Sequence, residues 1–174
     1  MKTITQTITQ TETCTLTSKQ GKITLIDFED YEKTKHLVWY THKNNPYFVT
    51  FYKSENNKLR TISLHRFIFN LKRGDGIVID HINRNIYDNR KCNLRKCTNS
   101  ENAQNSCKPN LKRKLTSQYK GVSWQKAINK FIAHICFQGK ITHIGCYVNE
   151  IDAAKAYNKK ALELHGDFAY INTF

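Results

Sequence analysis

The sequence has little negative charge, few prolines and no long apolar run. Its 174 residues include 14 Asp and Glu against 28 Lys and Arg, a formal net charge of +14, and only 2 Pro. A positive field of this strength favours a polyanionic partner. Nucleic acid fits that description. A membrane surface would need a basic amphipathic helix or a polybasic run beside an apolar segment, and we find neither.

Sequence signals for membranes and secretion are also lacking. No stretch approaches the roughly 20 apolar residues of a membrane-spanning helix. The Thr/Gln-rich start, residues 1–18, has no apolar core of the kind that signal peptides carry. We therefore expect an intracellular, cytoplasmic protein with no membrane partner.

No Cys-x-x-Cys pair occurs among the six cysteines. A tetrahedral zinc site usually shows two close ligand pairs, so this spacing favours reduced, partly buried thiols. A zinc site built from Cys92, Cys97 and Cys107 stays open as an alternative, which would make the chain a zinc-stabilised binding protein.

Patterning along the chain predicts an α+β protein made of small modules. A β-rich leader with aromatic strands comes first, then a strand, loop, strand and helix, and finally three alternating runs followed by one helix. We expect the last block to form a small three-stranded antiparallel sheet packed on that helix. The expected segments are a Thr/Gln-rich stretch (1–18), the leader (19–65), a central core (66–107), a basic linker (108–118) and a C-terminal domain (119–174).

The stretch "IDHINRNIYDNRKCNLRKCTNSENAQN", residues 79–105, holds the residues best suited to chemistry. Asp80 and His81 are adjacent at the end of a predicted strand. A neutral imidazole is a suitable general base, and a carboxylate with an amide oxygen suits magnesium or manganese. Thr98, Asn99 or Ser100 can cap the helix that follows. His65, on a nearby helical segment, is interpreted as a packed, hydrogen-bonded residue.

The same stretch resembles the HNH, or ββα-metal, nuclease motif of many homing endonucleases, through "DHIN", "DNR", "NLR" and "NSENAQN". The resemblance implies that Asp80 and Asn102 bind one divalent metal, Mg²⁺ or Mn²⁺, and that His81 activates water. It implies that Asn93 orients His81 and braces the loop. Four further residues stand at family-like positions, where side chains brace the loop or touch phosphate: Asp88, Asn89, Arg90 and Arg95.

Residues 119–174 resemble the plant-type APETALA/ethylene-response-factor DNA-binding domain, which also occurs fused to HNH nucleases in phages and mobile elements. The resemblance is carried by "YKGVSW", "KFIAHI" and "HIGCYVNEIDAAKAYNKKALELHGDFAYIN". It implies a sheet in the major groove with the helix behind it. The residues then expected to contact DNA are Lys120, Ser123, Gln125, Lys130, His134 and His143, with Lys112, Arg113 and Lys114 of the linker along the phosphates.

The sequence therefore predicts a metal-dependent DNA endonuclease that acts on double-stranded DNA, with no small-molecule substrate. One active site in a protein that is monomeric on DNA predicts a nick rather than a double-strand break. The alternative is a non-catalytic DNA-binding transcriptional regulator that retains an HNH-like core.

Overall fold

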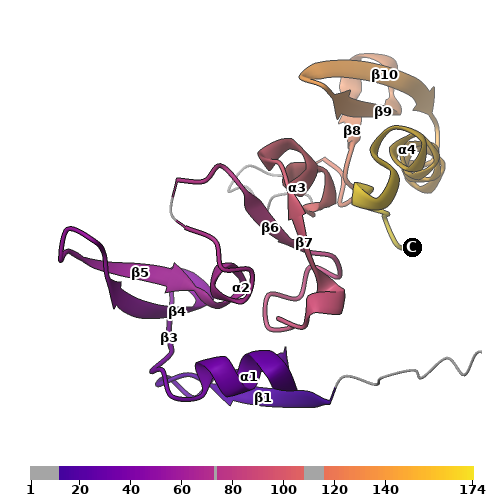
Figure 1. Cartoon of the computed structure of the whole chain (residues 1–174). Coiled ribbons are helices and arrows are strands. Elements are labelled where there is room, and N and C mark those ends of the chain that lie inside the picture. Colours follow the sequence, from indigo (N-terminus) through magenta and orange to yellow (C-terminus); the bar gives the residue numbers. More distant parts are fainter. Residues whose placement is uncertain (1–11, 73, 108–115) are drawn as a thin grey trace, which may run out of the picture. The chain divides into compact units, whose positions relative to one another are not determined.

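The computed structural model describes residues 12–72, 74–107 and 116–174, and it has the predicted α+β character (Figure 1). The chain divides into two compact units, Met1–Lys96 and Cys97–Phe174. The linker residues Lys112, Arg113 and Lys114 lie outside the described ranges, so their expected DNA contacts stay a prediction. Within those ranges, no helix is both long and apolar enough to span a membrane.

The part of the first unit before Leu64 forms two small antiparallel sheets, and the first of them includes residues 13–17 of the Thr/Gln-rich stretch. Strands β1 (Thr13–Thr17) and β2 (Ile23–Asp27) pair as a hairpin, followed by α1 (Phe28–Thr34). Strands β3 (Tyr40–His42), β4 (Asn45–Lys53) and β5 (Leu59–Ser63) form the second sheet, with β4 in the middle. A buried cluster unites these elements with the short α2 (Leu64–Ile68), and its members are Leu16, Ile26, Trp39, Phe48 and Leu64.

The segment after α2 has the predicted order of strand, loop, strand and helix. Strand β6 (Val78–His81) pairs with β7 (Leu94–Cys97), and the loop between them ends in the 3-10 turn η1 (Lys91–Asn93). Leu71, Ile79 and Leu94 form a second small core beneath this pair. The helix α3 (Asn99–Asn105) begins at Thr98, whose hydroxyl accepts from the backbone of Glu101 while the Glu101 carboxylate accepts from the backbone of Thr98. This capping box is the local reason for the helix start.

The second unit contains the predicted sheet and helix. The strands β8 (Val122–Gln125), β9 (Lys130–Phe137) and β10 (Lys140–Tyr147) pair in antiparallel order, with the 3-10 turn η2 (Lys126–Ile128) after β8. Helix α4 (Glu150–His165) and the turn η3 (Gly166–Phe168) follow. Helix and sheet share the core residues Val122, Ala133, Ile135, Ala153, Ala154, Tyr157 and Ala161.

A close approach of backbone to ring explains one glycine in this unit. Gly121 has a φ of +74°, and a Cβ on it would lie 2.0 Å from the ring of Tyr157 and 2.7 Å from the carbonyl oxygen of His134. Only glycine fits there, because both the backbone conformation and the space exclude a side chain. In the same unit, Trp124 and Phe131 are half-buried and Tyr157 is buried.

Candidate active site

Asp80 and His81 are buried at the end of β6, with 5% and 6% of their surfaces exposed. The strand ends immediately after them: the backbone N–H of Arg84 donates to the carbonyl oxygen of His81, and Arg84 has a φ of +64°. The neighbouring N–H of Ile82 donates to the carbonyl oxygen of Asn93 across the loop. The sharp turn after His81 is the strand break that a site shared by two adjacent side chains requires.

Asp80 forms an ion pair with Arg95 of β7. Nε and Nη2 of Arg95 lie 2.8 and 2.7 Å from Oδ2 of Asp80, and the side chains are 16% and 6% exposed. A carboxylate this deeply buried needs such a charge partner. The structure therefore gives Arg95 a role beside the proposed metal ligand, and its contact with phosphate stays a prediction.

The imidazole of His81 is held by Asn89. Nε2 of His81 lies 3.2 Å from Oδ1 of Asn89, and Nδ2 of Asn89 donates to the hydroxyl of Thr24 at 2.8 Å. Asn89 is 2% exposed and Thr24 1%. A buried chain of polar groups thus runs from β2 to the proposed base.

Asn93 acts on the loop instead. Its Oδ1 accepts from the backbone N–H of Asn83 at 2.9 Å, and its Nδ2 donates to the carbonyl oxygen of Asp88 at 2.8 Å. The amide of Asn93 faces the loop backbone, whereas Asn89 makes the side-chain contact with the ring, and the expectation that Asn93 orients His81 stays a prediction. The expected bracing of the loop by Asn93 matches these two hydrogen bonds.

Arg90 is engaged with Asp88 in the same loop. Its Nε and Nη2 donate to Oδ1 and Oδ2 of Asp88, both at 2.7 Å. This two-pronged contact lowers the pKa of the Asp88 carboxyl and outweighs the opposing effect of its burial. Arg90 therefore braces the loop in the structure, one of the two roles that the sequence left open for it.

His65 lies against His81, and the sequence did not reveal this. The two rings meet edge to face with centroids 5.5 Å apart, and the ring of Tyr47 lies 5.2 Å from His65 and 6.2 Å from His81. The hydroxyl of Ser63 is hydrogen-bonded to Nε2 of His65 at 3.0 Å. His65 is thus packed and hydrogen-bonded as expected, but it also forms one wall around the proposed base.

Burial keeps both histidines neutral. It lowers the pKa of His81, against the raising effect of the hydrogen bond with Asn89. Burial, with smaller effects of His81 and Arg66, lowers the pKa of His65 to about 3. A neutral imidazole at neutral pH is the form that can accept a proton from water.

The donor set at the proposed metal site is rich in oxygen. The carboxylate of Asp80 and an amide oxygen of Asn102 are hard donors of the kind that magnesium and manganese prefer. Asn102 is half-buried on α3, in the second unit, so its place beside Asp80 stays a prediction. Among the residues that the structure describes, no group of three or more His, Cys, Asp or Glu is placed to hold a metal ion.

Five of the residues expected to contact DNA share one face of the C-terminal sheet. Ser123 pairs with Ile132, Gln125 with Lys130, and His134 with His143, so the side chains in these pairs point to the same side. Val122, Ala133 and Ile135 point to the other side, where α4 packs. The residues brought together are Ser123, Gln125, Lys130, His134 and His143.

Lys120 has a different position from the other five. Its Nζ donates to the carbonyl oxygens of Ala103, Gln104 and Ser106 at 3.0, 2.7 and 2.6 Å. Ala103 and Gln104 stand in the last turn of α3 and Ser106 is its C-cap, and a cation is favourable at this end of a helix. The structure thus shows Lys120 capping the C-terminal end of α3, and its contact with DNA stays a prediction.

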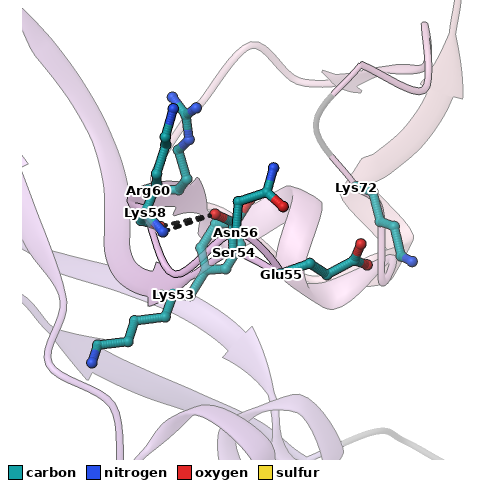
Figure 2. A pocket seen from close by; sticks show the side chains of 8 residues that line it. Lys53, Ser54, Glu55, Asn56, Lys58, Arg60 and Lys72 are labelled. Atoms are coloured by element: carbon teal, nitrogen blue, oxygen red, sulfur yellow. Dashed lines mark hydrogen bonds between the residues drawn. The ribbon is translucent and has the colours of Figure 1, made fainter.

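A cationic groove of about 710 Å³ lies at the tip of the β4–β5 hairpin. It is lined by Tyr52, Lys53, Ser54, Glu55, Asn56, Lys58, Arg60 and Lys72. Figure 2 shows Ser54 hydrogen-bonded to Lys58 at the turn, with Lys53 directed away from the side on which Arg60 lies. The lining holds four cationic side chains and one carboxylate, and none of the cations was singled out in the sequence because they come from three separate segments.

The segment that holds Asp80 and His81 matches a known protein family. Residues 63–104 match the model of the HNH endonuclease family. An uncharacterised HNH endonuclease of Acanthamoeba polyphaga mimivirus is 29% identical over 157 residues, which cover 88% of this chain and 76% of the relative. The family match ends before the C-terminal sheet, so the resemblance of residues 119–174 stays a prediction. The chain thus carries an HNH endonuclease domain, and it is an enzyme that hydrolyses DNA.

Proposed function

We propose that this protein is a metal-dependent, homing-type endonuclease that nicks duplex DNA at a site bound by its C-terminal domain. The observation that carries the proposal is the buried Asp80 and His81 pair at the end of β6, inside the segment that matches the HNH family. A buried carboxylate and a neutral imidazole at one turn supply two of the groups that phosphodiester hydrolysis needs.

His81 is the proposed general base. Its ring, held by Asn89, takes a proton from the attacking water, while Asn93 keeps the loop in shape through Asn83 and Asp88. Asp80 and Asn102 would hold one Mg²⁺ or Mn²⁺, which neutralises charge on the phosphate when bound. Arg95 keeps the carboxylate of Asp80 in place from β7.

Binding of DNA is assigned to the C-terminal sheet, in the manner of an APETALA/ethylene-response-factor domain. Support comes from the shared face of Ser123, Gln125, Lys130, His134 and His143 on the side away from α4. Ser, Gln and His can each bond to base edges, whereas a lysine more often contacts phosphate. The basic linker would follow the phosphates of the DNA. The groove of Figure 2 would give the leader a further contact with the DNA backbone.

The test is cleavage of supercoiled plasmid with Mg²⁺, with Mn²⁺ and with a chelator. We expect conversion to open circles with either metal and none with the chelator. Linear product from a protein that is monomeric on DNA would contradict nicking. If the wild type and His81→Ala bind DNA equally and neither relaxes plasmid with either metal, the chain is a non-catalytic regulator instead.

A further inference from the structure

The proton on the His81 imidazole has a position that the surrounding hydrogen bonds determine. A neutral imidazole carries its hydrogen on one ring nitrogen, and only the other nitrogen can accept a proton. A base therefore depends on which tautomer its neighbours favour. For His81, the tautomer can be deduced from nearby backbone carbonyl groups, because their oxygens can only accept hydrogen bonds.

The first fixed point is the amide of Asn89. One terminal atom of this amide lies 3.2 Å from the carbonyl oxygen of Ile86. Because that oxygen only accepts, the atom facing it is the amide nitrogen. The amide oxygen of Asn89 then faces Nε2 of His81.

The second fixed point is the hydroxyl of Thr24. It lies 2.8 Å from the carbonyl oxygen of Tyr87, and its hydrogen is therefore donated there. Its lone pair accepts from Nδ2 of Asn89 at 2.8 Å. Two separate carbonyl groups thus impose the same orientation on the amide of Asn89.

We infer that Asn89 and Thr24 are positioning residues that hold the hydrogen of His81 on Nε2 and so keep the accepting lone pair on Nδ1. Nε2 must donate, because the atom 3.2 Å from it is an amide oxygen. If the hydrogen were on Nδ1, two acceptors, Nε2 of His81 and Oδ1 of Asn89, would face each other in a buried site, which is unfavourable. The catalytic meaning of this arrangement rests on the proposed role of His81 as base.

The β1–β2 hairpin thereby becomes part of the support of the active site. Thr24 is 65 residues from Asn89 in the sequence, and the two are brought together by backbone hydrogen bonds on either side of them. The N–H of Leu25 donates to Tyr87, and the N–H of Asn89 donates to Leu25, both at 2.8 Å. The leader is thus fastened to the loop behind His81 at the point where the tautomer is set.

The direct test is the ¹⁵N NMR spectrum of the histidine rings of the full chain at about pH 8, where the imidazoles are neutral. The His81 signals are those absent from the His81→Ala spectrum. We expect a protonated Nε2 and an unprotonated Nδ1 in the wild type. The opposite tautomer would overturn the inference, and it is read from the wild-type spectrum, with His81→Ala serving only to assign the signals.

Variants of the hydrogen-bond chain Thr24–Asn89–His81, here called the relay, test the inference by its effect on cleavage. Asn89→Leu removes the acceptor and Thr24→Val removes the hydroxyl, so both should shift the tautomer signals and slow nicking roughly 10- to 100-fold, as when an outer partner of a functional histidine is lost. Thr24→Ser restores the hydroxyl and should restore both readouts. Thr50→Val is the matched control, because Thr50 is also buried and donates to a backbone carbonyl, that of Val38, at 2.9 Å.

The outcomes separate this inference from the proposed function. A protonated Nε2 in a wild type that does not nick DNA leaves the relay standing and contradicts the proposed function. A protonated Nδ1 in a wild type that nicks DNA overturns the relay alone. Equal slowing by Thr24→Val, Thr24→Ser and Thr50→Val would also overturn it, because that pattern reports only a loss of packing.

Discussion

The rings of His65 and His81 lie edge to face with centroids 5.5 Å apart. Both are neutral in the folded protein, and burial lowers the pKa of His65 to about 3 from an ordinary value of 6.5. A protonated His65 ring would lose its hydration in this buried site. The pair therefore links the stability of the first unit to pH.

We predict that the protein loses stability as the pH falls below 6.5, the ordinary pKa of the His65 ring. The unfolded chain takes up a proton at His65 below that pH, whereas the folded chain does so only near 3, so the free energy of unfolding decreases across this window. We expect a loss of roughly 1–2 kcal/mol by about pH 5. Urea unfolding of the wild type and His65→Gln measures it.

The variant should flatten the pH dependence, because Gln does not titrate. His36→Gln, at an exposed histidine of the same unit, is the control and should retain the slope of the wild type. Equal slopes for the wild type and His65→Gln would show that His65 does not carry the effect.

The ion pair of Asp80 and Arg95 predicts a large cost for removing one partner. Arg95→Met leaves a carboxylate that is 5% exposed without its guanidinium. Loss of one member of a buried pair typically costs about 3 kcal/mol, and denaturant unfolding should show a decrease of that order. Lys160→Met removes one member of the exposed pair with Glu163 and should leave stability near that of the wild type. A similar loss for both variants would contradict the buried pair.

Variants of Lys120 and Lys130 should have contrasting effects, the first on stability and the second on DNA binding. Lys120→Met removes the ammonium from three carbonyls at the end of α3, and we expect thermal unfolding to report a loss of roughly 1 kcal/mol. Lys130→Met, at an exposed position of β9, should keep stability and reduce the slope of log K against log salt by about 0.9, the effect of one phosphate contact. A reduced salt slope for Lys120→Met would instead place Lys120 on DNA.

The groove at the β4–β5 turn predicts a contribution to DNA affinity. The double variant Lys58→Ala/Arg60→Ala should weaken binding and reduce the salt slope by roughly 2, since each phosphate contact contributes about 0.9. Salt titration of a fluorescent duplex measures both quantities. Lys22→Ala/Lys43→Ala removes the same charge from exposed positions outside the groove. If the two double variants behave alike, only net charge matters.

Local features of this chain could be predicted from the sequence. The order of strand, loop, strand and helix around His81 depends on a β-branched run, turn-forming asparagines and a Thr98 cap, and all three act over a few residues. The C-terminal sheet could also be predicted, because alternation within β8, β9 and β10 decides which side chains face α4.

The partners within the site could not be predicted in the same way. Asn89 and Asn93 are both asparagines of one loop, and their roles differ because Thr24 of β2 lies beside the first of them. The contact of His65 with His81 likewise requires α2 to pack against β6. Such contacts join segments far apart in the chain, where neither periodicity nor spacing carries information.

The most direct measurement is single-turnover nicking of supercoiled plasmid by His81→Ala, at a protein concentration that saturates binding. The control is His36→Ala, at an exposed histidine of the same unit. Since a general base typically contributes 10²- to 10⁴-fold, we predict that His81→Ala binds DNA as the wild type does and nicks it at least roughly 100-fold more slowly. Nicking by His81→Ala at the rate of the wild type would contradict the account.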